Sequence, residues 1–494
     1  MKGAVTVHEE RRDVIVEVLN VRLPFEDKTR AQGTWKVQCT SGKVTNIMPF
    51  SWEETDIPVV DVKNDHSGRT VIEGNGGLLL PAFCHSHIHV DKCFILEQCG
   101  DLTTGDFSEA MRVTNLAKTR FPHQISDLYA RGSRIIRESV EHGVTCMRAH
   151  VEIDTSVGFS CLDVAQKLQD DYRAICDVEI AIFAQEPLLS SDNQMPSQNL
   201  LLLKEGAARQ GFDVIGSAPY VEANTKNAKA NIALIFDIAD EHEYNNVDFH
   251  LDYNLDPRSE PLIYEVIRQA RSRYVIHLDA STTEQDSGPR MSGTSTESDP
   301  RKRQCPNITI GHATRLQLFS KDEWRMLADE IKGLPITFVG LPQSDIYMQG
   351  RASKEDCLGA PRGTLRVPDL AREYGIHVAM SVNNVENAFT PQSSLDPLSL
   401  CTFGIAIFQA ATPRDIAELV RSVTRSSKRA IGYPDEDAKD LAPCIGDQAD
   451  FVILHGCTSL QSAVFNPPAE RTTIKGGKVV ASRRVVTWTA IGAN

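Results

Sequence analysis

Residues 78–92 read Leu-Leu-Leu-Pro-Ala-Phe-Cys-His-Ser-His-Ile-His-Val-Asp-Lys, an apolar run that ends in alternating polar side chains. His85, His87 and His89 stand at every second position, and Asp91 follows them. Because side chains alternate faces along a β-strand, all four would point to one side if the strand continues that far. Neutral imidazole is a good ligand for Zn or Fe, and His-x-His lets two rings reach one ion. The apolar lead-in favours a strand that ends in a metal site over a chance histidine cluster on a surface loop.

The length and composition of the chain are those of a globular protein with a large core. It has 494 residues, of which 41% are hydrophobic and 24% charged, enough for one large domain and a smaller one. A net charge of −14 disfavours nucleic acid and anionic membranes as partners. The sequence shows no signal-peptide core, no membrane-length apolar run and no Cys-x-x-Cys pair among its 12 cysteines. We therefore expect a cytoplasmic protein with reduced thiols.

The middle of the chain, residues 78–435, alternates strand-like and helix-like segments. Apolar, β-branched runs follow the opening strand at 144–151, 179–184, 213–217, 247–252, 307–312, 335–340 and 376–382. Helical patterns separate most of them, so these eight βα units predict a TIM barrel, (β/α)8. A polar stretch at about 281–306 interrupts the pattern and is typical of an insertion or a loop.

Both ends of the chain have a different texture, with short β-like runs separated by Gly and Asn. This pattern covers residues 1–77 and 436–494. We expect the two ends to form one small, composite β-sandwich domain.

Barrel enzymes place their sites at the C-terminal ends of the strands, so polar residues there are candidates. His250 and Asp252 end the fifth predicted strand, His312 ends the sixth, and Asn383 follows the eighth. A single histidine in such a place is more often a hydrogen-bonded core residue than a ligand. Four histidines at the ends of strands one, five and six favour a metal site.

At these residues the sequence resembles the amidohydrolase superfamily, specifically its cytosine deaminase-like branch, over nearly the whole chain. His87-Ile88-His89 matches the strand-one His-x-His of that family. The branch's further motifs are matched by the segments at 184–186, 213–222, 248–252, 311–312 and 346–351. The resemblance implies a barrel with a sandwich, and one divalent metal ion, Zn or Fe, on His87, His89 and His250. It puts Asn383 at the position of the last metal ligand.

The resemblance also implies an enzyme, a metal-dependent amidohydrolase or aminohydrolase. It would use a metal-activated water to hydrolyse a C–N bond of a small nitrogen-containing ring, by deamination or by cyclic amide or amidine hydrolysis. His312 would polarise the forming oxyanion or orient the water, and Gln185 would hydrogen-bond the substrate ring. We place Asn384 and Phe389 beside Gln185 as substrate-binding residues. The resemblance is also compatible with a homo-oligomer.

Two positions depart from the family pattern. Asn383 stands where the family has an aspartate that binds the metal and takes a proton from water, and a neutral amide is no base near pH 7. Tyr253 stands where the branch has a glutamate that shuttles a proton, and an unperturbed phenol has a pKa of about 10. The alternative is therefore an amidohydrolase-fold protein that has lost hydrolysis, and acts as a lyase, an isomerase or a ligand-binding pseudoenzyme.

Other ionisable residues lie close enough in sequence to replace the missing carboxylates. Asp252, two residues after His250, would face the same side of the strand, where it could act as an acid or base or orient a ligand imidazole. Lys92 and Glu386 are further candidates, which could instead form an ion pair with each other.

Overall fold

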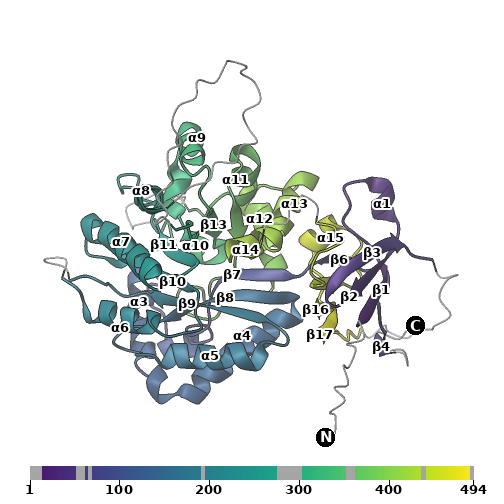
Figure 1. Cartoon of the computed structure of the whole chain (residues 1–494), viewed down its shortest axis with the longest axis horizontal. Helices are drawn as coiled ribbons and strands as arrows, with labels where there is room; N and C mark the ends of the chain where they lie inside the picture. Colours follow the sequence, from purple (N-terminus) through teal and green to yellow (C-terminus); the bar gives the residue numbers. More distant parts are fainter. Residues whose placement is uncertain are drawn as a thin grey trace, which may run out of the picture. The chain divides into compact units, whose positions relative to one another are not determined.

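A computed structural model describes residues 14–51, 62–64, 69–190, 195–274, 303–351, 362–392, 394–434 and 441–489. The chain divides into two compact units (Figure 1). One unit comprises Met1–Ala82, Val140–Thr145 and Asp437–Asn494, and the other comprises Phe83–Ser139 and Cys146–Glu436. Of the insertion predicted at 281–306, residues 281–302 lie outside the described part of the chain.

An eight-stranded sheet forms the barrel of the larger unit, which confirms the (β/α)8 prediction. Its strands follow one another in chain order: β7 (Phe83–His89), β8 (Val144–Glu152), β9 (Asp177–Ala184), β10 (Val214–Ser217), β11 (Asn246–Leu251), β12 (Asn307–His312), β13 (Ile336–Gly340) and β14 (Val378–Met380). Successive strands pair in parallel, and β7, β8 and β11 are buried along their whole length. The backbone N–H of Asn383 donates to the carbonyl of His87 at 3.1 Å, beside β14 and β7.

Helices accompany these strands: α2 (Leu96–Cys99), α3 (Phe107–Lys118), α4 (Ile125–Glu141), α5 (Ser160–Tyr172), α6 (Gln198–Ala207), α7 (Thr225–Glu241), α8 (Ile263–Arg273), α9 (Lys321–Glu330), α10 (Pro342–Met348), α11 (Val367–Tyr374), α12 (Pro397–Phe408), α13 (Pro413–Ser422) and α14 (Arg425–Ala430). Local sequence signals fix several of their ends. The Thr412 hydroxyl and the Asp415 carboxylate form a capping box at the start of α13, with Pro413 at its first position. No helix within the described residues is long and apolar enough to cross a membrane.

The smaller unit is a β-sandwich built from both ends of the chain, as predicted. One sheet has the order β3 (Lys43–Pro49), β2 (Trp35–Thr40), β1 (Ile15–Val21), β5 (Thr70–Glu73) and β4 (Val62–Asn64). The other has the order β17 (Lys478–Arg483), β16 (Arg471–Lys475), β15 (Phe451–Leu454) and β6 (Leu78–Pro81). Val18 and Val37 of the first sheet share a buried core with Phe451 and Ile453 of the second. Two further helices belong to this unit, α1 (Lys28–Gln32) and α15 (Leu460–Phe465).

The opening apolar run is divided between the two units. Leu78–Pro81 forms β6 and pairs antiparallel with β15, with Leu79 opposite Ile453. The first barrel strand starts only at Phe83, so the boundary lies after Ala82 and not after residue 77 as expected. A fully apolar run suits a buried strand of either sheet, and the sequence alone does not distinguish the two.

Candidate active site

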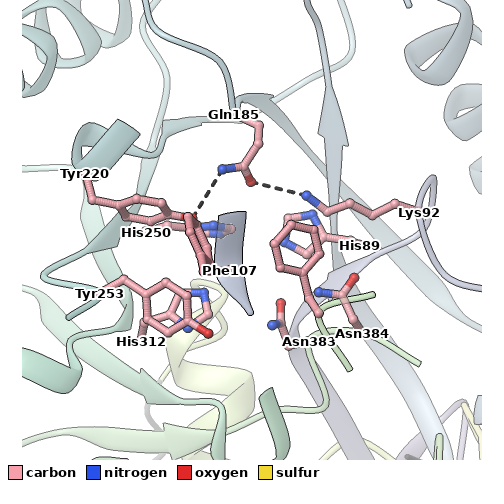
Figure 2. Close-up of a pocket in the computed structure, with 11 residues that line it drawn as sticks. His89, Lys92, Phe107, Gln185, Tyr220, His250, Tyr253, His312, Asn383 and Asn384 are labelled. Atoms are coloured by element: carbon pink, nitrogen blue, oxygen red, sulfur yellow. Dashed lines mark hydrogen bonds between the residues drawn. The ribbon is translucent and has the colours of Figure 1, made fainter. Parts of the chain in front are cut away.

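A small pocket lies at the C-terminal ends of the barrel strands (Figure 2). Its walls consist of histidines, amides, aromatic rings and one lysine: His89, Lys92, Phe107, Gln185, Tyr220, His250, Tyr253, His312, Asn383, Asn384 and Phe389. Most of the candidate residues of the sequence analysis meet here, although they come from five strand ends and the loops that follow them.

Three of the predicted metal ligands form a buried cluster of imidazoles. The ring centroid of His87 lies 4.3 Å from that of His250 and 5.4 Å from that of His89. His89 and His250 are 5.2 Å apart. His87 and His89 stand two residues apart on β7, so both rings lie on the same side of the strand, as the alternation predicts.

The protonation state of this cluster, and its buried atoms without hydrogen-bond partners, are consistent with a metal site. Burial, reinforced by neighbouring cationic and histidine groups, holds the pKa of His87, His89 and His250 well below the usual range, so the rings are neutral near pH 7. Both ring nitrogens of His87, Nε2 of His250 and Oδ1 of Asn383 are buried without a hydrogen-bond partner among the described residues. Such atoms cost about 1–3 kcal/mol each unless a ligand satisfies them. Neutral imidazole is the form that binds metals.

A second grouping of potential ligands overlaps the first. Ligand atoms of His87, His150, Asp248 and His250 all lie within 4.8 Å of one another, and all four residues are buried. However, Asp248 already has two partners. Its Oδ2 lies 3.1 Å from Arg148 Nη1, and its Oδ1 lies 3.1 Å from His150 Nε2. Burial would raise the Asp248 pKa, but these two neighbours hold it below its usual range. The four buried residues could bind a divalent ion, but Asp248 is already paired with Arg148 and His150.

His150 and Arg148 were not identified from the sequence, although a signal existed. Arg148 and His150 alternate along the predicted strand at 144–151, and Glu152 continues the alternation one residue beyond it. Polar side chains at every second position of an otherwise apolar barrel strand point to its interior.

His312 is held by a carboxylate that the sequence analysis did not identify. Its Nδ1 lies 2.8 Å from Oδ1 of Asp345 in α10. Asp345 is buried, and its Oδ2 accepts from the Leu341 backbone N–H at 3.1 Å and from the Thr364 hydroxyl at 2.6 Å. These contacts fix the ring of His312 and leave Nε2 for the pocket. Tyr253 packs on the same ring, with centroids 3.9 Å apart.

Asp252 does not take the place expected for it. Its two oxygens accept from the backbone N–H groups of Leu262 at 2.7 Å and Ile263 at 3.2 Å, and it does not line the pocket. The alternation rule fails because β11 ends at Leu251 and Asp252 has a left-handed φ of 51°. Burial raises its pKa to about 7, but both carboxyl oxygens are engaged by backbone N–H groups at the start of α8. The suggested pairing of Lys92 with Glu386 is also not formed, because Lys92 binds Glu152 and Glu386 lies 3.5 Å from Arg134.

One edge of the pocket carries a line of polar contacts. Lys92 Nζ donates to Gln185 Oε1 at 3.2 Å, and Gln185 Nε2 donates to the Tyr220 hydroxyl oxygen at 3.2 Å (Figure 2). Phe107 and Phe389 lie next to them, with ring centroids 5.8 Å apart. A flat ring could therefore be held by both aromatic packing and hydrogen bonds.

The fold, a TIM barrel in one chain with a β-sandwich from both termini, is similar to that of solved deaminase and aminohydrolase structures. The 5-methylcytosine deaminase of Klebsiella pneumoniae liganded with 5-fluorocytosine matches it with a TM-score of 0.74 at 20% identity, covering 96% of this chain and 99% of that chain. The N-isopropylammelide isopropylaminohydrolase of Burkholderia multivorans matches with a TM-score of 0.68 at 19% identity, covering 95% and 99%.

A comparison of sequences gives a similar result. N-isopropylammelide isopropyl amidohydrolase of Pseudomonas sp. (strain ADP) is 20% identical over 432 residues, which are 86% of this chain and 92% of the relative. No family model matches the chain. The homologues and structural neighbours are thus amidohydrolases and deaminases of one superfamily, which confirms the resemblance seen in the sequence motifs.

Proposed function

We propose that this protein is a divalent-metal-dependent hydrolase that breaks a non-peptide C–N bond in a small nitrogen-containing ring. Deamination and cyclic amide or amidine hydrolysis are the two forms of this reaction. The observation that carries the proposal is the cluster of neutral, buried imidazoles with unsatisfied nitrogens beside a small pocket. The names of its relatives, amidohydrolases and deaminases, support the same class of reaction.

His87, His89 and His250 would hold the ion, Zn or Fe, with Asn383 Oδ1 as a weak fourth ligand. This set is favoured over one with Asp248 because His89 and Asn383 line the pocket, whereas Asp248 is paired with Arg148. A bound divalent ion would supply Lewis acidity, which makes water a better nucleophile at neutral pH.

The remaining steps belong to the side chains of the pocket. His312 would take and return a proton at Nε2, since Asp345 fixes its Nδ1. Burial raises the pKa of Tyr253 well above its usual value, so its hydroxyl stays protonated near pH 7 and cannot act as a base. Gln185, Lys92 and the aromatic rings would orient the substrate.

One observation favours the alternative of a protein without hydrolysis. None of the residues described as lining the pocket is an aspartate or a glutamate. An enzyme here would then depend on His312 alone for proton transfer, whereas a binding protein would need no proton-transfer group.

Metal content is the measurement that tests the proposal. We expect near-stoichiometric Zn or Fe per chain in the wild type and in His123→Ala, whose histidine is exposed, and a large loss in His87→Ala. Aminated and cyclic-amide heterocycles would then be screened for ammonia release or ring opening. No metal in the wild type after reconstitution, or full retention in His87→Ala, would refute the metal site.

A further inference from the structure

We propose that Ser344 is a positioning residue, which together with Thr390 holds the side-chain amide of Asn383 so that its oxygen, and not its nitrogen, faces the imidazoles of the pocket. The basis is a chain of buried polar side chains that leads from Asn383 through Ser344 to Thr390. The inference rests on the function proposed above and concerns the weak fourth ligand of the same site.

The backbone of Asn383 is fixed to the strand that carries two of the proposed ligands. Its N–H donates to the carbonyl of His87 at 3.1 Å, and its own carbonyl accepts from the N–H of His89 at 3.0 Å. The residue has a left-handed φ of 68°, which asparagine tolerates better than most residues. With the backbone held in this way, the choice that remains is which end of the amide faces the pocket, because rotation about its last bond exchanges oxygen and nitrogen.

The two ends of this amide have different surroundings. Nδ2 donates to Ser344 Oγ at 2.8 Å, whereas Oδ1 is buried without a hydrogen-bond partner in the part of the chain that the structure describes. Figure 2 shows this oxygen turned toward the middle of the pocket, which His89 and His250 also line. A cation in the pocket would meet the oxygen, but with the amide reversed it would meet N–H groups, which repel it.

Thr390 determines what the Ser344 hydroxyl can do for Asn383. Ser344 Oγ lies 2.6 Å from Thr390 Oγ1, and a hydroxyl has a single proton to donate. When Ser344 gives that proton to Thr390, its oxygen is left to accept from Asn383 Nδ2, which is the contact that the structure contains. Without Thr390 Oγ1 the proton of Ser344 would be free to bind the amide oxygen, and the amide would then turn its nitrogen to the pocket. Thr390 is itself fixed, since its backbone N–H donates to Asn387 Oδ1 at 2.9 Å.

This arrangement is needed only because residue 383 is an asparagine. An amide has one acceptor end and one donor end, so a neighbouring group must select between them. An aspartate has two equivalent oxygens, and either of them can face a metal ion. The Ser344 hydroxyl should therefore matter for metal binding in the wild type and matter far less after Asn383→Asp.

Zinc affinity, measured by chelator competition on the full chain, tests the positioning role. Ser344→Ala removes the acceptor of Nδ2, and Thr390→Val removes the acceptor of the Ser344 proton. Each should lower the affinity by at least about fivefold. Ser427→Ala is the matched control, because this equally buried hydroxyl pairs with the hydroxyl of Ser86 and not with Asn383. Its zinc affinity should equal that of the wild type.

Two further measurements separate the orientation of the amide from a general effect on the fold. In the Asn383→Asp background, adding Ser344→Ala should change zinc affinity by less than about twofold. With cobalt(II) in place of zinc, the visible absorption of Ser344→Ala should approach that of Asn383→Leu, which has no ligand atom at this position. If Ser344→Ala does not fold, Thr390→Val takes its place in both backgrounds.

An unchanged zinc affinity in Ser344→Ala or in Thr390→Val would overturn the inference. An equal loss with asparagine and with aspartate at position 383 would also overturn it, because a purely structural role of Ser344 would act in both backgrounds. If the wild type binds zinc and either result is found, the proposed metal site stands and only the positioning role is lost. A wild type that binds no zinc would refute the metal site as well.

Discussion

Asn383 presents a buried oxygen without a hydrogen-bond partner among the described residues, while its Nδ2 donates to Ser344 Oγ at 2.8 Å. Asn383→Asp would place a charged oxygen beside the histidines, and the Ser344 hydroxyl could donate to the second oxygen. We expect zinc affinity, measured by chelator competition, to rise by about tenfold or more, and any hydrolytic rate to rise with it. Asn384→Asp, a charge at the adjacent lining residue, is the control. An unchanged or lower rate in Asn383→Asp would mean that the site works through another base.

The His312–Asp345 pair gives a second prediction for a single residue. Asp345→Asn removes the carboxylate that accepts from Nδ1, so the ring can adopt the wrong tautomer and Nε2 no longer serves as the base. We expect kcat to fall by roughly a hundredfold, with KM and metal content nearly unchanged. Thr364→Val removes a different partner of Asp345 and should have a much smaller effect. A parallel loss of bound metal would assign Asp345 a structural role only.

Strand β12 makes room for the histidine cluster through a glycine. A Cβ at Gly311 would lie 2.8 Å from Cε1 and 3.0 Å from Nδ1 of His87. Gly311→Ala should therefore displace the His87 ring and lower zinc affinity by about tenfold or more. Gly340→Ala on β13, where the nearest atom is 3.4 Å away, is the matched control. Equal zinc affinities of the two variants would show that His87 is not held where the ion binds.

A buried ion-pair network connects β8 to α3 and to the segment after β7. Burial would raise the Glu152 pKa, but Lys118 and Lys92 hold it at about 2. Since this is below the unfolded value of about 4.5, the network stabilises the fold fully above pH 4.5, and this contribution is lost as the pH falls towards 2. Glu152→Gln should cost about 3 kcal/mol in urea unfolding at pH 7. The difference from wild type should shrink between pH 4.5 and 3, and a constant difference would contradict the assignment.

At the scale of the whole molecule, the barrel and the composite sandwich follow from patterns in the sequence. Eight strands alternate with helices, and each of these elements is indicated by a short local pattern in the sequence. The positions that sequence reasoning missed depend on contacts between distant residues or on a backbone angle. Asp345 is identified only by its contact with His312, the partners of the candidate Lys92 are seen only in the structure, and Asp252 leaves the strand at a positive φ. Such features require the folded chain.

The division into two units predicts where metal binding stabilises the protein. His87, His89 and His250 all belong to the barrel unit, so an ion that binds only the folded state would stabilise that unit. At a free concentration about a hundred times Kd the gain is about 2.7 kcal/mol, which corresponds to a rise of roughly 5 °C in Tm. Hydrogen exchange with zinc or with EDTA should show lower protection after metal removal in β7 and β11, and little change in β1 and β2. His87→Ala should show no response to EDTA. Equal changes in both units, or a full response in the variant, would place the stabilising ion elsewhere.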